Sequence, residues 1–570
     1  MTAPGGLVVP LADAIRAHVA PGMHLHFAST PSRSNAAIRE VARAFLDARP
    51  GFHVSSTGLH SMAHLLPLLG LVDRLTACFF GDHYPAPRPN ALYSRLAAGG
   101  MVLEHWPLWT MVASFRAGAQ GDDWVVNRSL RGTSIAGALA ARGAYREVAL
   151  PESGSPPTGL CAALRPDVTF VHAAAADADG HVIMTGPRSE GVWSALAARR
   201  GVIVTVERIV PAEVTRAHAE AIALPPHRVL AICEEPFGAH PQPLTCPPGL
   251  GVTPYRDDFA HYEHWRELSN HAGALAAFVA RVLRADDAGA AYRAYVGPDQ
   301  LAALTTSTPA PVITASAPTP ERAAVDRLII AGARQLAARA RAIDARVLIA
   351  GIGHAFFAAR IAQLQLAAAG ARLRVMVETG LYDVDCGPDG HGYLLAYENW
   401  IRARRLTAID DILGVLACGA DNRCLAALGA AQIDPRGQLN STRLGDKILV
   451  GAGGACDIAA SAADVVVLTR LAPGRLVREV EYITSPGHAV RSVVTERGVL
   501  TRPDATTTTW TLAALAAPGD DPHERLAAFR RACPWRVMPA DDLTTPPITD
   551  DEARLLHALD PTGTYRHRAG

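Results

Sequence analysis

The chain contains the same succession of helix, strand, loop and helix twice, and this internal repeat constrains its fold more than any other feature. In the first half the segments are LADAIRAHVA, MHLHF, ASTPSRS and NAAIREVARAF. In the second half they are AAVDRLIIAGARQLAARARA, ARVLIA, GIGH and AFFAARIAQLQLAA. A D-x-x-G turn follows in each half, Asp177 to Gly180 in the first and Asp434 to Gly437 in the second. Each turn precedes a helix of small residues and then a β-branched strand.

The alternation of strands and helices predicts an α/β fold, with a mostly parallel sheet covered by helices on both faces. The run VIVTV at 202–206 is typical of a strand that is buried on both sides. We therefore expect two homologous open α/β domains packed around a shared cleft, which is where such folds bind ligands. The alternative is two α/β domains that share this pattern by chance.

A segment rich in Thr, Pro, Ser and Ala separates the two halves. It spans residues 303–321 and reads ALTTSTPAPVITASAPTPE. Proline stiffens such a segment, and no packing period runs through it, so we interpret it as a linker. The predicted domains are therefore 1–302 and 322–570.

The balance of positive and negative residues argues against two classes of partner. Lys plus Arg and Asp plus Glu both number 54, so neither nucleic acid nor an anionic membrane is expected as the main partner. The nine cysteines are scattered without a C-x-x-C pair, which favours reduced thiols in a cytoplasmic protein. The first residues do not resemble a signal peptide, and we expect no membrane span and no metal site.

The segment RVMVETGLYD, residues 374–383, carries the main candidate for catalysis. An apolar strand runs directly into Glu378, which Thr379 and Gly380 follow. Reactive groups often lie at the carboxyl ends of buried strands in α/β sheets, and a carboxylate there can attack a thioester carbonyl. The structural alternative is a strand-end glutamate that pairs with an arginine or caps the next helix.

Two glycine-containing turns are candidates for binding an anion or an oxyanion. The loop in ILVGAGGACDIAA holds Gly451, Gly453, Gly454 and Ala455 between a strand and a helix. The turn in IAGIGHAFF holds Gly351 and Gly353 in the same arrangement. A tight strand-to-helix turn that needs small residues explains either pattern equally well.

The first half offers fewer chemical signals. His26, Ser29 and Arg33 cluster in its first strand and loop, and Glu104 lies in the polar and aromatic segment MVLEHWPLW. These residues are candidates for lining a carboxylate-binding pocket. A lone histidine or glutamate is more often structural, so each of them is a weak signal by itself.

In this order the motifs resemble the family I CoA-transferases of the glutaconate type, with the A and B subunits fused in one chain. The first half is similar to the A subunit in PDVTFVHAAAADADGHV, GVIVTVERIV and EEPFGAHPQP. The second half is similar to the B subunit in VLIAGIG, VETG, GAAQIDPRGQLNST, GGACDIA and VEYITSPG. Two segments depart from the family pattern. The nucleophile motif reads Glu378-Thr379-Gly380, and a His26-Phe27-Ala28 stretch stands where Gly-Gly-Phe is usual, which suggests an unusual acyl group.

The resemblance implies a fold, an activity and a site. The fold is the NagB/CoA-transferase type, and the activity is the movement of CoA from an acyl-CoA to a carboxylic acid through a glutamyl-CoA thioester on Glu378. Gly351, Gly353 and the loop from Gly451 to Ala455 would contact CoA or an oxyanion. Coenzyme A would be a substrate, no tightly bound cofactor is needed, and a homodimer is one expected assembly.

Two other functions stay open from the sequence. The first is an acyl-CoA hydrolase or ring-opening C–C hydrolase on the same fold, for which Glu104 would supply a second carboxylate. The second is a non-catalytic acyl-CoA-binding protein, which would bind CoA without turnover and without a covalent adduct on the glutamate. Retention of Glu378 favours transfer, although a fold by itself does not fix a function.

Overall fold

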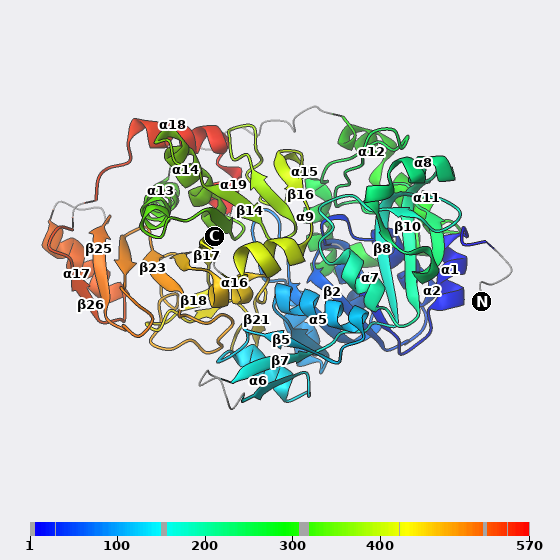
Figure 1. The fold of residues 1–570 in the computed structure, drawn as a ribbon, viewed down its shortest axis with the longest axis horizontal. Helices are drawn as coiled ribbons and strands as arrows, with labels where there is room; N and C mark the ends of the chain where they lie inside the picture. Colours follow the sequence, from blue (N-terminus) through cyan, green and yellow to red (C-terminus); the bar gives the residue numbers. More distant parts are fainter. Residues whose placement is uncertain are drawn as a thin grey trace.

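The computed structural model describes residues 6–28, 30–149, 157–306, 319–420, 422–516, 521–543 and 545–568. Figure 1 shows two α/β halves side by side, the first (blue to green) on the right and the second (green to red) on the left. The centre of the first sheet and the centre of the second are each covered by helices, which confirms the predicted two-domain α/β fold.

The first half is built on a nine-stranded sheet within the described residues. Its central strands run in the order β2-β1-β8-β10-β12 and are all parallel. Strands β3 and β4 extend this parallel sheet beyond β2, and the antiparallel strands β9 and β11 extend it beside β8. The bounds are β1 His24–Phe27, β2 Phe52–Leu59, β3 Val72–Phe80, β4 Val102–His105, β8 Val168–Ala176, β9 Val182–Ile183, β10 Gly201–Ile209, β11 Ile222–Leu224 and β12 Val229–Glu234.

The second half is built on a ten-stranded sheet, again counted over the described residues. Its parallel centre runs in the order β14-β13-β17-β22-β23. Antiparallel strands β15 and β16 extend one side, while β24, β25 and β26 extend the other. The bounds are β13 Val347–Ala350, β14 Arg374–Val377, β15 Leu381–Val384, β16 Ala403–Leu406, β17 Cys424–Gly429, β22 Asp464–Leu468, β23 Val490–Val494, β24 Gly498–Thr501, β25 Trp510–Leu515 and β26 Val537–Pro539.

The two sheets repeat one topology. Strands β1, β2, β8, β10 and β12 of the first half take the same places as β13, β14, β17, β22 and β23 of the second, in the same order and all parallel. Agreement at five strands is far more than a shared pattern of hydrophobic residues would produce. The chance alternative is therefore wrong, and the halves are structural repeats.

The two D-x-x-G turns have the same hydrogen bonds. Asp177 Oδ1 accepts from the amides two and four residues later, both at 3.0 Å. Asp434 Oδ1 accepts from the equivalent amides at 2.9 and 3.0 Å. Gly180 and Gly437 both have positive φ angles, +98° and +80°, which L-residues rarely adopt. The spacing in the sequence thus reflects one side-chain-capped turn used twice.

Helices cover the sheets, and none of the described helices is long and apolar enough to cross a membrane. In the second half, α13 and α14 pack on one face of the sheet, and α16 with the helix η6 packs on the other. Helix α13 starts at Pro320, inside the predicted linker, whose residues 307–318 lie outside the described residues. The helices of the second half are α13 Pro320–Ala342, α14 His354–Ala368, α15 Tyr397–Trp400, η6 Asp410–Ala417, α16 Ala455–Ser461, α17 Pro522–Ala532, α18 Asp550–Leu559 and α19 Thr564–Arg568.

The first half carries a small three-stranded sheet, ordered β5-β7-β6, that lies against α5 and α6. Side chains of this part and of the second-half sheet form one hydrophobic core, so the interface between the halves is packed like a domain interior. The elements of the first half not yet given are α1 Leu11–His18, α2 Asn35–Ala44, α3 Leu65–Leu68, α4 Ala91–Ala98, α5 Leu108–Gln120, β5 Trp124–Asn127, α6 Ser134–Ala140, β6 Tyr145–Val148, β7 Thr158–Ala162, α7 Gly191–Ala197, α8 Ala212–Ala217, α9 Phe259–Asn270, α10 Ala272–Phe278, α11 Ala288–Val296 and α12 Pro298–Leu304.

Candidate active site

Glu378 occupies the turn between β14 and the antiparallel strand β15. Gly380 closes this turn with φ +124°, and a Cβ at that position would lie 2.5 Å from the carbonyl oxygen of Thr407. The Thr407 amide in turn donates to the Gly380 carbonyl at 2.7 Å. The glycine is therefore required by both its conformation and the close approach of the chain, and it fixes the glutamate at the carboxyl end of β14.

A backbone amide of the glycine loop holds the Glu378 carboxylate. The Gly454 N–H donates to Glu378 Oε2 at 3.1 Å, and this is the one hydrogen bond to the carboxylate within the described residues. A Cβ on Gly454 would lie 2.2 Å from the same oxygen, so no larger residue fits without displacing the glutamate. Oε1 therefore has no hydrogen-bond partner in the described part of the chain.

The surroundings of Glu378 favour its neutral form. Burial raises the pKa of this carboxyl to about 7, the negative charge of Asp457 adds to the rise, and the Gly454 amide opposes it. The residue is nonetheless only partly buried, so a substrate has access to it. A carboxyl group with a pKa near neutrality, at a strand end between two domains, is a candidate for catalysis.

The glycine loop is fixed by contacts within the protein. The Gly451 amide donates to the Ser441 carbonyl at 2.9 Å, the Gly453 amide to Cys78 at 3.0 Å, and the Ala455 amide to Ala452 at 2.9 Å. Of the four residues predicted to contact CoA in this loop, Gly454 alone directs its amide at the candidate site. The sequence suggested that the N–H groups of Gly451, Gly453 and Ala455 are free to bind an anion. In the structure each of them donates a hydrogen bond within the protein.

The second predicted turn follows β13, the strand next to β14. Gly351 donates its amide to the Ala427 carbonyl at 2.9 Å. Gly353 precedes α14 with φ +93°, and its amide donates no hydrogen bond within the described residues. Because β13 and β14 are parallel neighbours, this turn and Glu378 lie at the same edge of the sheet.

The first half contributes His26 from β1, together with a glutamate that the sequence did not single out. His26 Nδ1 contacts Ser55 Oγ at 2.9 Å, and its Nε2 lies 3.4 Å from Glu190 Oε1. Both side chains are fully buried. Residues 188–190 pair with 407–409, the segment that also bonds Gly380, so one segment after β16 supports both the turn of Glu378 and Glu190.

Arg33 is buried at the carboxyl end of β2. Its guanidinium donates to the carbonyls of Gly58 and His60 at 2.7 and 2.9 Å and to the Asn35 side chain at 3.1 Å. Burial lowers the pKa of this group to about 10, so it keeps its charge at neutral pH. Ser29, the remaining candidate in this loop, lies outside the described residues.

Glu104 is engaged in ion pairs and hydrogen bonds. Thr76 Oγ1 donates to it at 2.8 Å, Arg74 contacts it at 2.5 Å, and Arg142 lies 3.5 Å away. Glu104 lies on β4, the edge strand of the first sheet, opposite Thr76 of β3. The structure therefore does not bring Glu104 together with Glu378 through any contact, and its oxygens have partners.

Three residues that the sequence did not single out surround the site: Cys78, Glu190 and Asp457. Burial raises the pKa of the Cys78 thiol well above its usual range, and the charges of Asp457, Glu190 and Glu378 contribute to the rise. Asp457 could have been found in the sequence, because it lies three residues after Gly454. Glu190 has no such signal, since only the fold brings it near.

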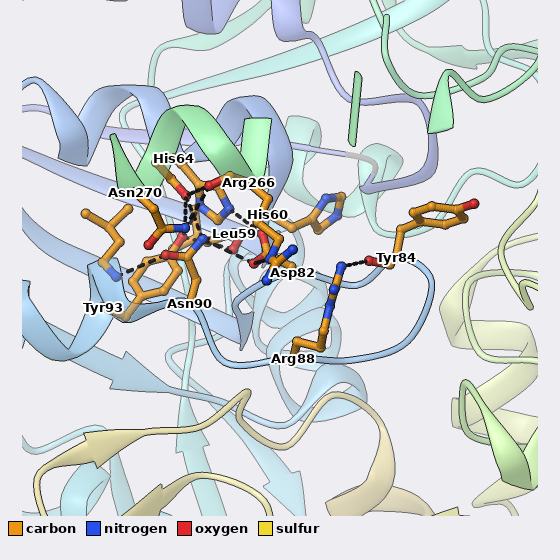
Figure 2. A network of polar contacts seen from close by, with 12 residues as sticks. Leu59, His60, His64, Asp82, Tyr84, Arg88, Asn90, Tyr93, Arg266 and Asn270 are labelled. Atoms are coloured by element: carbon orange, nitrogen blue, oxygen red, sulfur yellow. Dashed lines mark hydrogen bonds and ion pairs between the residues drawn. The ribbon is translucent and has the colours of Figure 1, made fainter. Parts of the chain in front are cut away.

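A hydrogen-bonded network fixes the loops that follow β2 and β3, as Figure 2 shows. Asp82 accepts from His64 Nε2 at 3.3 Å and from the Asn90 side chain at 3.2 Å, while Tyr93 contacts His64 Nδ1 at 2.9 Å. Tyr93 also donates to the Leu59 carbonyl at the end of β2. The network therefore stabilises the part of the first half that faces the second.

Next to this network lie polar atoms without hydrogen-bond partners in the described residues. They are both ring nitrogens of His60, Nε2 of His83 and the hydroxyl of Ser61. The three residues are buried, and the two imidazole rings lie 3.8 Å apart. Burial lowers the pKa of His83 to about 3 and that of His60 well below 6.5, so both rings are neutral. Such orphaned groups are unusual in native interiors and suit a polar ligand.

A pocket of about 290 Å³ opens at the interface between the halves. The first half lines it with the start of α5 and the end of β5, and the second half lines it with η6 and the end of α16.

Three residues of the first half could in principle hold a metal ion, and they lie apart from this pocket. The potential ligand atoms of His240, Asp258 and His261 lie within 4.8 Å of one another. Hydrogen bonds of 3.0 to 3.1 Å from both histidines to Asp258 already explain why these side chains lie together.

Comparison with known proteins finds similarity to CoA-transferases. Residues 8–235 match the family model described as Coenzyme A transferase. The A subunit of the 3-oxoadipate CoA-transferase of Pseudomonas knackmussii is 29% identical over 171 residues, which are 30% of this chain and 56% of that protein. The B subunit of the glutaconate CoA-transferase of Acidaminococcus fermentans is 38% identical over 71 residues, 12% of this chain and 26% of that protein. Both halves of the chain thus contain segments similar to coenzyme A transferases.

The matches cover only part of the relatives. The chain spans about half or less of the length of the first curated relatives that it matches, 40% of an uncharacterized protein of Archaeoglobus fulgidus and 56% of the Pseudomonas protein. The fold extends further. An acyl-CoA transferase of Escherichia coli O157:H7, solved as a thioester complex with CoA, superposes with a TM-score of 0.63 at 15% identity over 97% of both chains. The predicted fold is thus confirmed, and the predicted resemblance to CoA-transferases agrees with the sequence matches.

Proposed function

We propose that this chain is a CoA-transferase that moves CoA from an acyl-CoA to a carboxylic acid through a thioester on Glu378. One observation carries the proposal: a carboxyl group at the end of β14 is held by the Gly454 amide at 3.1 Å, with its second oxygen without a partner in the described residues. A fixed carboxylate with one unengaged oxygen is suited to nucleophilic attack.

The reaction divides into balanced steps. Oε1 of ionised Glu378 attacks the thioester carbonyl, the C–S bond breaks, and CoA leaves as a thiolate while an acyl-glutamyl anhydride remains. The thiolate then attacks Cδ of Glu378, the donor carboxylate leaves, and a glutamyl-CoA thioester forms. The acceptor carboxylate attacks this thioester, and the same two steps in reverse release the new acyl-CoA and the free glutamate.

The site residues take distinct parts in this proposal. The amides of Gly454 and Gly353 would stabilise developing oxyanions. The Gly454 amide donates to the nucleophile itself, and the Gly353 amide donates no hydrogen bond within the described residues. Gly351, Gly451, Gly453 and Ala455 would hold these turns in place, since their amides are engaged. His26 and Arg33 of the first half, with the neutral rings of His60 and His83, would contact polar atoms of the acyl group.

The hydrolase alternative required a carboxylate free to act at Glu104. The two arginines and the threonine that contact Glu104 favour a structural part for it instead. A homodimer and a cytoplasmic location stay predictions from the sequence.

An exchange assay tests the proposal. The purified chain is incubated with a panel of acyl-CoA thioesters, each with and without isotope-labelled carboxylic acids, and new acyl-CoA and free CoA are followed by mass spectrometry. Transfer predicts labelled acyl-CoA that depends on an acceptor and disappears in Glu378→Gln. Release of free CoA without an acceptor, unchanged in Glu378→Gln, would show a hydrolase and contradict the proposal.

A further inference from the structure

Asp457 is a buried carboxyl group that the proposed chemistry does not use. It lies on α16, three residues after Gly454, and none of its surface is exposed. A buried carboxylate is costly unless several hydrogen bonds compensate it, so its partners indicate what it is for.

The partners of Asp457 belong to the other half of the chain. Oδ2 accepts from the Trp109 amide at 2.8 Å, and Oδ1 accepts from Thr110 Oγ1, also at 2.8 Å. Immediately before them, the Leu108 amide donates to the Gly453 carbonyl at 2.9 Å. The first amides of a helix have no partner inside the helix, and its N-terminal end carries partial positive charge. Gly453 and Asp457 thus cap α5 across the interface.

The same short segment holds the nucleophile. Gly454, whose amide binds Glu378 Oε2, lies between the two residues that cap α5. In addition to its carbonyl contact with α5, Gly453 donates its amide to the Cys78 carbonyl in β3 of the first half. The position of the Gly454 amide is therefore set by contacts on both sides with the first half.

The negative charge of Asp457 also acts on the Glu378 carboxyl group. Burial raises the pKa of Asp457 to about 6, so it is mostly ionised at pH 7, and its charge raises the pKa of Glu378. The charge of Asp457 also acts on four thiols, and burial raises the pKa of each of them: Cys78, Cys161, Cys418 and Cys456. Near neutral pH, Asp457 is thus the charged neighbour of the nucleophile among these groups.

We propose that Asp457 is a positioning residue for CoA transfer: by capping α5 from the opposite half, it holds the Gly453–Gly454 loop against Glu378. The inference rests on the proposed function, because it concerns the same nucleophile. It makes the alignment of Glu378 depend on correct docking of the two halves, and it makes the ionisation of Glu378 depend on the charge of Asp457.

Three variants of the full chain test this proposal. Asp457→Asn removes the charge and one acceptor from α5. Thr110→Val breaks the cap from the other side without removing a buried charge, so it decides the matter where Asp457→Asn does not fold. Asp464→Asn is the matched control, because Asp464 is another fully buried aspartate of this half that is bonded to Arg339 and contacts neither α5 nor Glu378. Each variant is assayed for the rate of adduct formation on Glu378, for KM of the acyl-CoA and for the pH profile.

Positioning predicts that Asp457→Asn and Thr110→Val lower the rate of adduct formation about tenfold or more, with KM changed little. In Asp457→Asn the acid limb of the profile moves to lower pH, because the negative charge that faces Glu378 is gone. Asp464→Asn keeps the wild-type rate and acid limb. A folded Asp457→Asn or Thr110→Val with the wild-type rate would overturn the inference while leaving the proposed function intact. A wild-type chain that forms no adduct would instead contradict the proposed function, and the inference with it.

Discussion

The Gly454 amide and the Glu378 carboxylate are joined by a hydrogen bond of 3.1 Å across 76 positions of the sequence. This bond connects the hairpin that carries the nucleophile to the loop that docks on the first half. It leaves Oε1 without a hydrogen-bond partner in the described residues and gives Oε2 a donor, which orients the carboxylate.

Activity should depend on the ionisation of Glu378. Because its pKa is raised to about 7, the nucleophilic form is scarce below that pH and predominates above it. We expect kcat/KM for acyl-CoA to rise with pH through about 7 and then level off. A profile measured between pH 5 and 9 checks this, and a plateau that already begins at pH 5 would contradict it.

Substitution of Gly454 should disable the site. In Gly454→Ala the added Cβ would lie 2.2 Å from Glu378 Oε2 and 3.3 Å from Leu413, so the glutamate must move. A displacement of this kind lowers the rate about 100-fold. The matched control is Gly137→Ala, where a Cβ meets nothing within 4 Å. Equal transfer rates in the two variants would show that the contact between Gly454 and Glu378 is unimportant.

The buried carboxyl group should also cost stability at high pH. Its pKa is higher in the folded chain than in the unfolded chain, so the folded state loses stability as pH rises from about 4.5 to about 7. Glu378→Gln removes this loss and should be more stable than wild type by up to about 3 kcal/mol at pH 8, with little difference at pH 4. Chemical denaturation of both proteins at the two pH values measures the difference. A Glu378→Gln variant that is destabilised equally at pH 4 and pH 8 would contradict this, because it would show that burial does not disfavour the charged form of Glu378.

Glu104 should matter for stability and not for chemistry. Glu104→Gln weakens the contacts with Arg74 and Arg142 and should cost about 1–2 kcal/mol of unfolding free energy. Transfer by the folded variant should stay within about twofold of wild type, because Glu104 makes no contact with Glu378. Thermal unfolding and the exchange assay together check this. Loss of turnover in a stably folded variant would restore the hydrolase interpretation.

The sequence predicts the fold well because the repeat is expressed in local patterns. The predicted segments NAAIREVARAF, ARVLIA and VIVTV overlap α2, β13 and β10, since each carries its own local hydrophobic pattern. The D-x-x-G turns are equally local, because the aspartate caps amides two and four residues away. The order of the strands in each sheet was not predicted, because the pairing of strands far apart in the chain leaves no local pattern.

The site is less predictable because its contacts are long-range. The glutamate was recognisable from the strand that precedes it, but its partner could not be, since nothing in GAGG says which amide turns inward. The structure shows that Gly451 and Gly453 bond the chain itself while Gly454 binds Glu378. Glu190 is brought to the site by a loop pairing that no local pattern reveals. Glu104, by contrast, stands out in the sequence, but its carboxylate accepts from Arg74 and makes no contact with Glu378.

The central claim is that Glu378 becomes covalently linked to CoA, and this is tested most directly by mass spectrometry of the protein after incubation with acyl-CoA alone. The account predicts a mass increase equal to CoA less water, located by proteolysis on the peptide that contains Glu378, removed by an added carboxylic acid and absent from Glu378→Gln. An active wild-type protein that carries no such adduct, or an adduct that persists in Glu378→Gln, would contradict the account.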